Sequence, residues 1–279
     1  MLRVGIVGAG RAGRARMRAI SERDDVTLAG VASSQADTGT HRFEDLVASP
    51  ELDAILVCSV NAAHVAQAEA ALDAGKHVLC EYPLALSHDD AVHLFDLAHE
   101  RGRVLHVEHI ELLSGSQLAL RRVARGLGRP IDGLYHTEAN SEGWIADMRL
   151  AGFPSFSGIS RLSRLVDLFG PAGIEDAVFD ESEEEQRLVV DLRFVHGGRC
   201  RLDYRRGRGL PRREDWEVRC ERGVLETMPP VPTKPLFAAD LDVFVRRITE
   251  GAESYVSDEQ ILDVMSLAEE IENRCRGGR

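Results

Sequence analysis

The chain has 279 residues, enough for one large domain or two smaller ones with a substantial hydrophobic core. Its formal net charge of −12 argues against a general binder of nucleic acids or of membrane surfaces. No apolar run approaches the ~20 residues of a transmembrane helix, and the N-terminus lacks the parts of a signal peptide, so we expect a cytoplasmic protein. Five cysteines without a C-x-x-C disfavour a disulfide framework and a zinc site, and no metal is expected.

The N-terminal part alternates between strand-like and helix-like segments. Apolar, β-rich runs predict strands over 2–8, 26–33, 53–59, 77–83 and 103–110, and apolar spacing predicts helices over 11–23, 41–49, 61–75 and 87–102. This alternation is typical of a parallel sheet with helices on both faces.

After about residue 117 the pattern changes. Strand-like runs at 133–140, 177–180, 187–196, 199–207 and 215–228 suggest antiparallel pairing, with helices over 161–170, 240–251 and 257–277. The sequence HGG at 196–198 predicts a hairpin turn. We therefore expect an α/β protein: a Rossmann dinucleotide-binding domain over 1–117, then an α+β domain over 118–279 with a large, mostly antiparallel sheet.

A glycine-rich turn follows the first predicted strand. Gly8, Gly10 and Gly13 form G-x-G-x-x-G, and Arg11 and Ala12 fill the turn as it opens a helix. Glycines at this spacing let main-chain N–H groups approach a pyrophosphate at a helix N-terminus. The context predicts NAD(P) binding rather than a simple tight turn.

The tip of the second predicted strand bears on cofactor choice. Ser33 and Ser34 stand where NAD-preferring sites often carry an acid that binds the ribose hydroxyls. The serines can donate hydrogen bonds to a 2′-phosphate, and Arg11 or Arg14 can supply its counter-charge. We favour NADPH, with NADH as the alternative. Ser59, at the end of the third predicted strand, is a further candidate for cofactor binding.

The stretch CEYP at 80–83 ends the fourth predicted strand. Together, VGIVGAGRAG (4–13) and DAGKHVLCEYP (73–83) resemble the Gfo/Idh/MocA oxidoreductases. Those enzymes usually carry a lysine between the glutamate and the proline, and this lysine acts on a sugar hydroxyl. Here Tyr82 takes the place of the lysine, and the matching helix at 153–170 contains no histidine.

These departures resemble one branch, the biliverdin reductase family related to the mammalian A enzyme. The resemblance is carried, in order along nearly the whole chain, by residues 10–18, 74–87, 102–113, 152–170 and 267–275. The region 175–235 matches more loosely. The resemblance implies NAD(P)H-dependent reduction of biliverdin to bilirubin, by hydride transfer to the central meso carbon of the linear tetrapyrrole.

The resemblance also suggests roles for individual residues. Tyr82 would line the cofactor site beside the nicotinamide and is a candidate acid, with Glu81 orienting it or the nicotinamide. Arg161 and Arg164 are three residues apart on one predicted helix and suit the two propionates. Arg161 is also a catalytic candidate, holding a water or acting through its field. The alternatives are packing of Tyr82 on Pro83, a purely structural salt bridge for Glu81, and surface positions for both arginines.

Three further candidates follow the fifth predicted strand. Glu108 and Glu111 are candidates for substrate binding, and His109 is a candidate acid near neutral pH, with a structural histidine as the alternative. The expected partner is a small-molecule linear tetrapyrrole, with neither nucleic acid nor membrane, and oligomeric state is left open. Competing functions are a sugar or cyclitol dehydrogenase and a non-catalytic NAD(P)-binding regulator.

Overall fold

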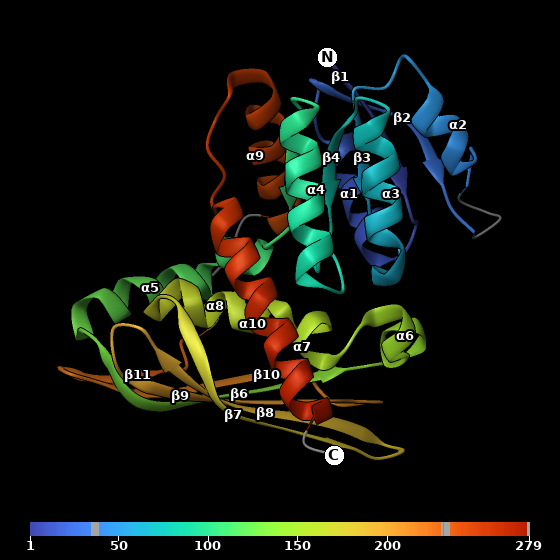
Figure 1. Ribbon diagram of the computed structural model, residues 1–279. Helices are drawn as coiled ribbons and strands as arrows, with labels where there is room; N and C mark the ends of the chain where they lie inside the picture. Colours follow the sequence, from blue (N-terminus) through green and yellow to red (C-terminus); the bar gives the residue numbers. More distant parts are fainter. Residues whose placement is uncertain (35–38, 230, 232–234, 278–279) are drawn as a thin grey trace. The chain divides into compact units, whose positions relative to one another are not determined.

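The computed structural model describes residues 1–34, 39–229, 231 and 235–277 (Figure 1). The chain divides into two compact units. Unit 1 comprises Met1–Ile110 and Lys234–Leu262, and unit 2 comprises Glu111–Thr233 and Asp263–Arg279. This division differs from the single boundary after residue 117 that the sequence suggested, because a C-terminal segment returns to the N-terminal unit.

Unit 1 is built on a parallel five-stranded sheet in the order β2-β1-β3-β4-β5. The strands are β1 (Leu2–Val7), β2 (Val26–Ala32), β3 (Ala54–Val57), β4 (His77–Cys80) and β5 (Leu105–Val107). The predicted parallel sheet is confirmed. β4 and β5 end three residues earlier than predicted, so 81–83 and 108–110 lie beyond the strands.

Helices cover both faces of this sheet, as the sequence predicted. They are α1 (Arg11–Ser21), α2 (Phe43–Ala48), α3 (His64–Asp73), α4 (His88–Glu100) and α9 (Leu236–Glu250), with a 3-10 turn η1 (Asn61–Ala63). α3 and α4 pack together on one face, and α1 and α9 pack together on the other (Figure 1).

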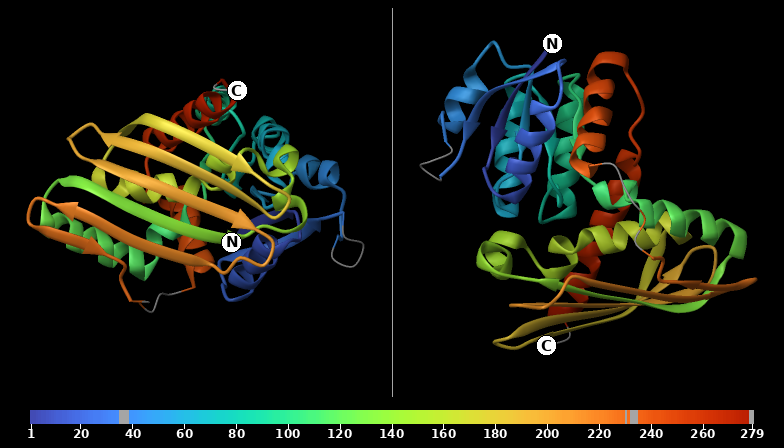
Figure 2. Two further views of the ribbon diagram at one scale, coloured as in Figure 1. Left: turned by 90° about the horizontal axis from the view of Figure 1, so that it is seen from below. Right: turned by 180° about the vertical axis from the view of Figure 1, so that it is seen from behind.

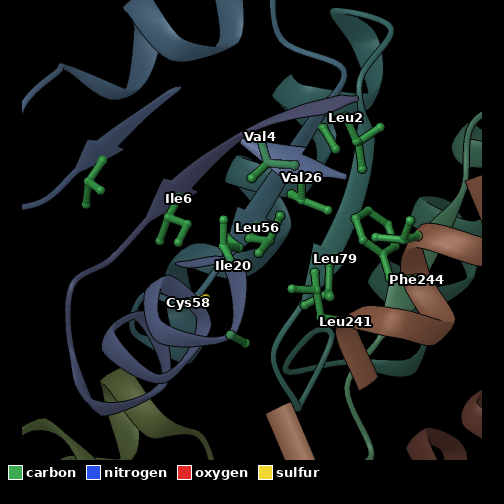
Figure 3. Packing of buried hydrophobic residues seen from close by; sticks show 14 of the residues in the cluster. Leu2, Val4, Ile6, Ile20, Val26, Leu56, Cys58, Leu79, Leu241 and Phe244 are labelled. Atoms are coloured by element: carbon green, nitrogen blue, oxygen red, sulfur yellow. The ribbon is translucent and has the colours of Figure 1, made fainter. Parts of the chain in front are cut away.

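The core beneath α1 and α9 explains why the C-terminal segment belongs to unit 1. Val4 and Ile6 of β1, Leu56 of β3, and Leu241 and Phe244 of α9 are fully buried in one cluster (Figure 3). Burial of each such side chain contributes roughly 1.5–3 kcal/mol. The helical spacing over 240–251 was readable in the sequence, but its packing partner was not.

Unit 2 contains a six-stranded sheet in the order β11-β10-β6-β9-β8-β7. The strands are β6 (Pro130–Asn140), β7 (Ala172–Glu181), β8 (Glu185–Phe194), β9 (Arg199–Gly207), β10 (Arg213–Cys220) and β11 (Gly223–Glu226). Only the β6–β9 pair of these described strands is parallel, so the sheet is mostly antiparallel, as predicted.

The helical elements of unit 2 include two that lie on one face of its sheet, α5 and α8 (Figure 2). The elements are α5 (Gly115–Leu127), η3 (Gly143–Ala146), α6 (Met148–Ala151), α7 (Pro154–Ser157) and α8 (Ile159–Phe169); η2 (Ile110–Leu113) and α10 (Asp258–Gly277) span the division between units. Alternate residues of β8, including Leu188, Val190 and Leu192, are buried, the pattern of a one-sided sheet. Within the described ranges, no helix has the length and apolarity needed to span a membrane.

Candidate active site

The parallel strands of unit 1 end in one row. Val7 is in register with Ala32 and Val57, Val57 with Cys80, and Cys80 with Val107. In open α/β sheets, ligands bind at the carboxyl ends of the strands. The residues that directly follow these five strands are Gly8, Ser33, Cys58, Glu81 and Glu108. The structure therefore brings the predicted cofactor residues of unit 1 to one edge.

The glycines of the turn after β1 have different roles. Gly8 has φ +96°, and a Cβ there would lie 2.5 Å from the carbonyl oxygen of Cys58. A Cβ at Gly13 would lie 2.0 Å from the carbonyl oxygen of Gly8, so this glycine lets α1 pack on the turn. A Cβ at Gly10 would meet no described atom within 4 Å. Gly8 and Gly13 therefore fix the turn, and Gly10 leaves its backbone open to a ligand.

The N-terminus of α1 fits a phosphate group. Within this fully described helix, Gly10 provides no side-chain cap and the first turn has no acidic residue. The N–H groups and the helix dipole thus favour an anion. Arg11 is exposed and Ala12 is partly buried, whereas Arg14 donates from Nη1 to the carbonyl oxygen of Ala9 at 2.8 Å. Arg14 thus stabilises the turn, and Arg11 is the better placed counter-charge.

The serine candidates lie at the same edge. Ser33 follows β2 and is partly buried, and Ser34 is exposed. Ser59 lies beyond β3, and its hydroxyl donates to Oε1 of Gln67 at 2.6 Å. The structure therefore places Ser33 and Ser34 at the tip of β2, as expected, and fixes Ser59 against α3.

Glu81, which follows β4, is held by a buried arginine. Arg16 of α1 is fully buried and donates from Nε to Oε1 of Glu81 at 2.9 Å. Nη2 of Arg16 lies 2.6 Å from Oδ2 of Asp240, and Nη1 donates to the carbonyl oxygen of Phe237 at 3.2 Å. Burial raises the pKa of Glu81, although the charge of Arg16 opposes this shift. One guanidinium thus ties the end of β4 to α9.

Asp240 extends this cluster. Its Oδ1 lies 2.8 Å from Nε2 of His106 and accepts a hydrogen bond from the Tyr255 hydroxyl at 2.6 Å. Burial acts to raise the pKa of Asp240, but Arg16 and His106 hold it well below the usual range. The carboxylate is therefore ionised at neutral pH. We call Arg16, Glu81, His106, Asp240 and Tyr255 the unit 1 charge cluster.

Sequence reasoning missed four members of this cluster: Arg16, His106, Asp240 and Tyr255. Arg16 alone carried a signal, because it lies on the stripe of α1 that also contains the buried residues Gly13, Ala19 and Ile20. An arginine on an apolar stripe indicates a buried partner. The pairing with Asp240 joins positions far apart in sequence and had no local signature.

Glu108 and His109 follow β5 and are both buried. Oε1 of Glu108 accepts from the N–H of Ile110 at 2.8 Å, and Oε2 has no hydrogen-bond partner among the described residues. Burial, together with the charges of Glu81 and Asp240, raises the pKa of Glu108 well above its usual value. The buried carboxyl of Glu108 therefore favours its neutral form more strongly than an exposed glutamate does.

His109 lies in an environment that opposes its expected role as an acid. The backbone N–H of His109 donates to the Tyr255 hydroxyl at 2.8 Å. Burial lowers the pKa of the imidazole to about 4. The ring is therefore neutral at pH 7. This environment favours a structural histidine, the alternative given by the sequence, over an acid that acts near neutral pH.

Tyr82 and Pro83 follow Glu81. Their peptide bond is cis, and Tyr82 is partly buried. The buried His64 places Nδ1 2.8 Å from the carbonyl oxygen of Pro83 and Nε2 3.4 Å from that of Ser59. Burial lowers the pKa of His64. This histidine, which sequence reasoning also missed, links the segments that follow β3 and β4 and so fixes the backbone beside Tyr82.

The arginines predicted to bind propionates have different environments in unit 2. Arg161, near the start of α8, is partly exposed, and its guanidinium lies 4.1 Å from the centre of the Tyr204 ring. Arg164 is only 4% exposed, pairs through both terminal nitrogens with Glu214, and donates from Nε to Oε1 of Gln117 at 2.8 Å. Arg164 is therefore already occupied by an internal carboxylate, contrary to its expected role.

Glu111 is also paired within unit 2, with Oε1 2.5 Å from Nη2 of Arg212. Its expected role in substrate binding would require this pair to open. Among the described residues, no group of three or more His, Cys, Asp or Glu side chains is arranged to hold a metal ion.

Comparisons with known proteins match both parts of the chain. Residues 2–109 match the family described as "Oxidoreductase family, NAD-binding Rossmann fold", and residues 132–232 match "Biliverdin reductase, catalytic". Mouse biliverdin reductase A is 33% identical over 284 residues, covering 97% of this chain and 95% of the mouse protein. The human enzyme is 33% identical with the same coverage.

A solved structure agrees with these relatives. The crystal structure of biliverdin reductase from Synechocystis sp. PCC 6803, in complex with biliverdin and NADP+, has a TM-score of 0.89 and 28% identity, covering 99% of both chains. With full-length identity above 30% to the mammalian A enzymes and a match to the catalytic family model, this chain belongs to the biliverdin reductase family.

Proposed function

We propose that this chain catalyses the NADPH-dependent reduction of biliverdin to bilirubin. Family membership supports this function. The structural observation that carries it is the segment Glu81, Tyr82 and Pro83, which follows β4 at the carboxyl edge of the parallel sheet. The position that holds a lysine in the sugar-acting relatives holds a tyrosine. A sugar or cyclitol dehydrogenase is therefore the weaker reading.

The cofactor would bind along the carboxyl edge of the unit 1 sheet. The turn from Gly8 to Gly13 would hold the pyrophosphate with main-chain N–H groups and the N-terminus of α1. Arg11, Ser33 and Ser34 would hold the 2′-phosphate, which favours NADPH over NADH. Ser59 would line the same edge after β3.

When bound, the reduced nicotinamide supplies a hydride, which reaches the central meso carbon of the tetrapyrrole. Tyr82 would shape the pocket for the nicotinamide with its ring, and Arg16 would keep Glu81 in position beside it. Arg161 would bind a propionate and hold the water that protonates the pyrrole nitrogen. Arginine itself is a poor proton donor because its pKa exceeds 12.

An absorbance assay with purified protein, biliverdin IXα, and NADPH or NADH in parallel tests this function. We expect the green pigment to convert to a yellow one, faster with NADPH. A parallel reaction with myo-inositol and NAD⁺ serves as the control for a cyclitol dehydrogenase. Demonstrated NADPH binding without pigment conversion would favour that enzyme class or a non-catalytic regulator.

A further inference from the structure

Arg206 lies in the interior of unit 2. It is on β9, and alternation along this strand places it on the same face as Leu202 and Tyr204, which are also buried. Only 1% of Arg206 is exposed. An arginine so deep in a domain normally has a carboxylate partner, because burial of an unpaired charge is unfavourable.

The contacts of Arg206 are with neutral groups. Nε donates to Oε1 of Gln186 at 2.5 Å, and Nη1 donates to the hydroxyl of Ser157. Nη2 is buried without a hydrogen-bond partner in the described part of the chain. The ion pairs found among the described residues include none to Arg206; the groups that raise its pKa are the phenol of Tyr204 and, to a smaller extent, the carboxylate of Glu181.

The other fully buried arginines are compensated. Arg16 contacts Glu81 and Asp240, and Arg164 is bidentate on Glu214. Arg206 alone of these three retains a buried positive charge without a direct carboxylate partner in the described ranges. The buried positive charge of Arg206 therefore lacks a negative partner, and binding of an anion from outside the unit would stabilise it.

A second guanidinium lies in the same neighbourhood. Arg161 lies over the ring of Tyr204, two residues from Arg206 on β9, and Ser157 holds Arg206 from the helical turn just before Arg161. Gly158 lets the two elements approach, because a Cβ there would lie 2.6 Å from Cε1 of Tyr204. Burial lowers the pKa of Arg206, and the like charge of Arg161 adds to this shift.

We propose that Arg206 and Arg161 together form a carboxylate subsite, which takes a propionate of the tetrapyrrole. The proposal rests on the proposed function and names a substrate-binding residue for it. Arg161, which is partly exposed, would contact the carboxylate directly. Arg206, which is buried on β9, would offer the hydrogen-bond donor Nη2 and would add positive electrostatic potential at the subsite. Arg206 thus takes the part that the sequence assigned to Arg164, whose guanidinium is held by Glu214.

The test compares biliverdin with its dimethyl ester, in which both propionates are neutral. Binding of each pigment is titrated by absorbance without cofactor, for the wild type, Arg206→Gln and Arg206→Lys. The matched control is Arg205→Gln, which removes the same charge from the neighbouring residue, whose guanidinium pairs with Glu138 and Glu185. Melting temperatures establish that each variant is folded.

We expect Arg206→Gln to weaken biliverdin binding by about tenfold, the scale of one charge-assisted hydrogen bond. The dimethyl ester should lose less than about twofold. Arg206→Lys, which keeps the charge, should retain most of the affinity for biliverdin, and Arg205→Gln should bind both pigments as the wild type does. If Arg206→Gln is unfolded, Arg161→Gln makes the same comparison, because loss of the partly exposed arginine of the subsite should weaken binding of biliverdin more than binding of the dimethyl ester.

Equal loss for both pigments, or wild-type binding by Arg206→Gln, would overturn the subsite. The assay of pigment conversion separates this result from failure of the proposed function. Turnover by the wild type with unchanged binding in Arg206→Gln removes the subsite alone. Charge-selective loss of binding without any turnover supports the subsite and removes the reductase function.

Discussion

The two units differ in how completely their buried arginines are paired with carboxylates. In unit 1, the guanidinium of Arg16 contacts the carboxylates of Glu81 and Asp240. In unit 2, Arg164 is paired but Arg206 contacts only neutral acceptors. Charges compensated internally hold a backbone in place, whereas a charge left uncompensated is available to a ligand. In the proposed function, unit 1 would accordingly supply a fixed edge for the cofactor, and unit 2 would supply positive charge for an anionic substrate.

The largest expected effect comes from breaking the unit 1 charge cluster. Asp240→Asn removes the carboxylate that Arg16, His106 and Tyr255 share, and leaves the buried Arg16 with Glu81 alone. Loss of one partner of a buried ion pair costs about 3–5 kcal/mol in the free energy of unfolding. Chemical denaturation measures this change.

Asp242→Asn is the matched control for Asp240→Asn. It lies two residues away on α9, is 44% exposed, and pairs with Arg23 and Arg246. Exposed pairs of this kind contribute about 0–1 kcal/mol. Equal destabilisation by the two variants would show that the cluster is no more than another surface network.

In unit 2, removal of the partly exposed arginine should affect catalysis rather than folding. We expect Arg161→Ala to lower kcat/KM for biliverdin by on the order of 100-fold, the scale of an electrostatic donor in an active site. Its dissociation constant for NADPH should stay within about twofold, because Arg161 lies outside the nucleotide-binding unit. Steady-state kinetics and a fluorescence titration with NADPH measure both.

The control for Arg161→Ala is Arg219→Ala, which removes an exposed arginine paired with Asp132. It should leave kcat/KM unchanged. If Arg161→Ala also turns biliverdin over at the wild-type rate, Arg161 does not belong to the site.

The sequence predicted the edge of unit 1 better than the interior of unit 2, for a physical reason. A parallel sheet places the residues after each strand in one row, so Gly8, Ser33 and Glu81 were brought together by topology alone. The partners of an arginine in a helix or an antiparallel strand depend on tertiary packing. Arg161 and Arg164 share a helix face by spacing, yet one lies over Tyr204 and the other pairs with Glu214.

The assignment of α9 to unit 1 is a second feature that depends on tertiary packing and could not be predicted from local sequence. Its apolar spacing was visible, but nothing local specified that Leu241 and Phe244 pack on β1 rather than on the second sheet. The Asp240 partner of Arg16 arrives with this helix. A single boundary drawn along the sequence therefore missed this packing and two of the five residues of the unit 1 charge cluster, Asp240 and Tyr255.

The pH dependence of stability tests whether unit 1 keeps its buried groups in fixed ionisation states. The pKa of His109 is about 4 when folded, against about 6.5 when unfolded, so the native state favours the neutral ring. Its contribution is complete above pH 6.5 and is lost as the pH falls through 4. Between pH 7.5 and pH 5, the wild type should lose about 2 kcal/mol of unfolding free energy more than His109→Gln does.

Urea denaturation at a series of pH values measures this difference. His64, whose pKa is also lowered by burial, is present in both proteins and cancels in the comparison. Parallel profiles for the two proteins would mean that His109 titrates normally and that the end of β5 is open to water.

The smallest expected effect concerns Tyr82, where unit 1 contributes shape rather than charge. Tyr82→Phe keeps the ring after β4 and the backbone that His64 fixes through Pro83, and removes only the hydroxyl. We expect kcat/KM for biliverdin to fall by roughly threefold to tenfold, the scale of one hydrogen bond. This loss should be smaller than that of Arg161→Ala, because Tyr82→Phe removes a neutral hydroxyl whereas Arg161→Ala removes a charged group. A complete loss of turnover with intact NADPH binding would reverse the order and assign an essential proton or hydrogen bond to the tyrosine hydroxyl.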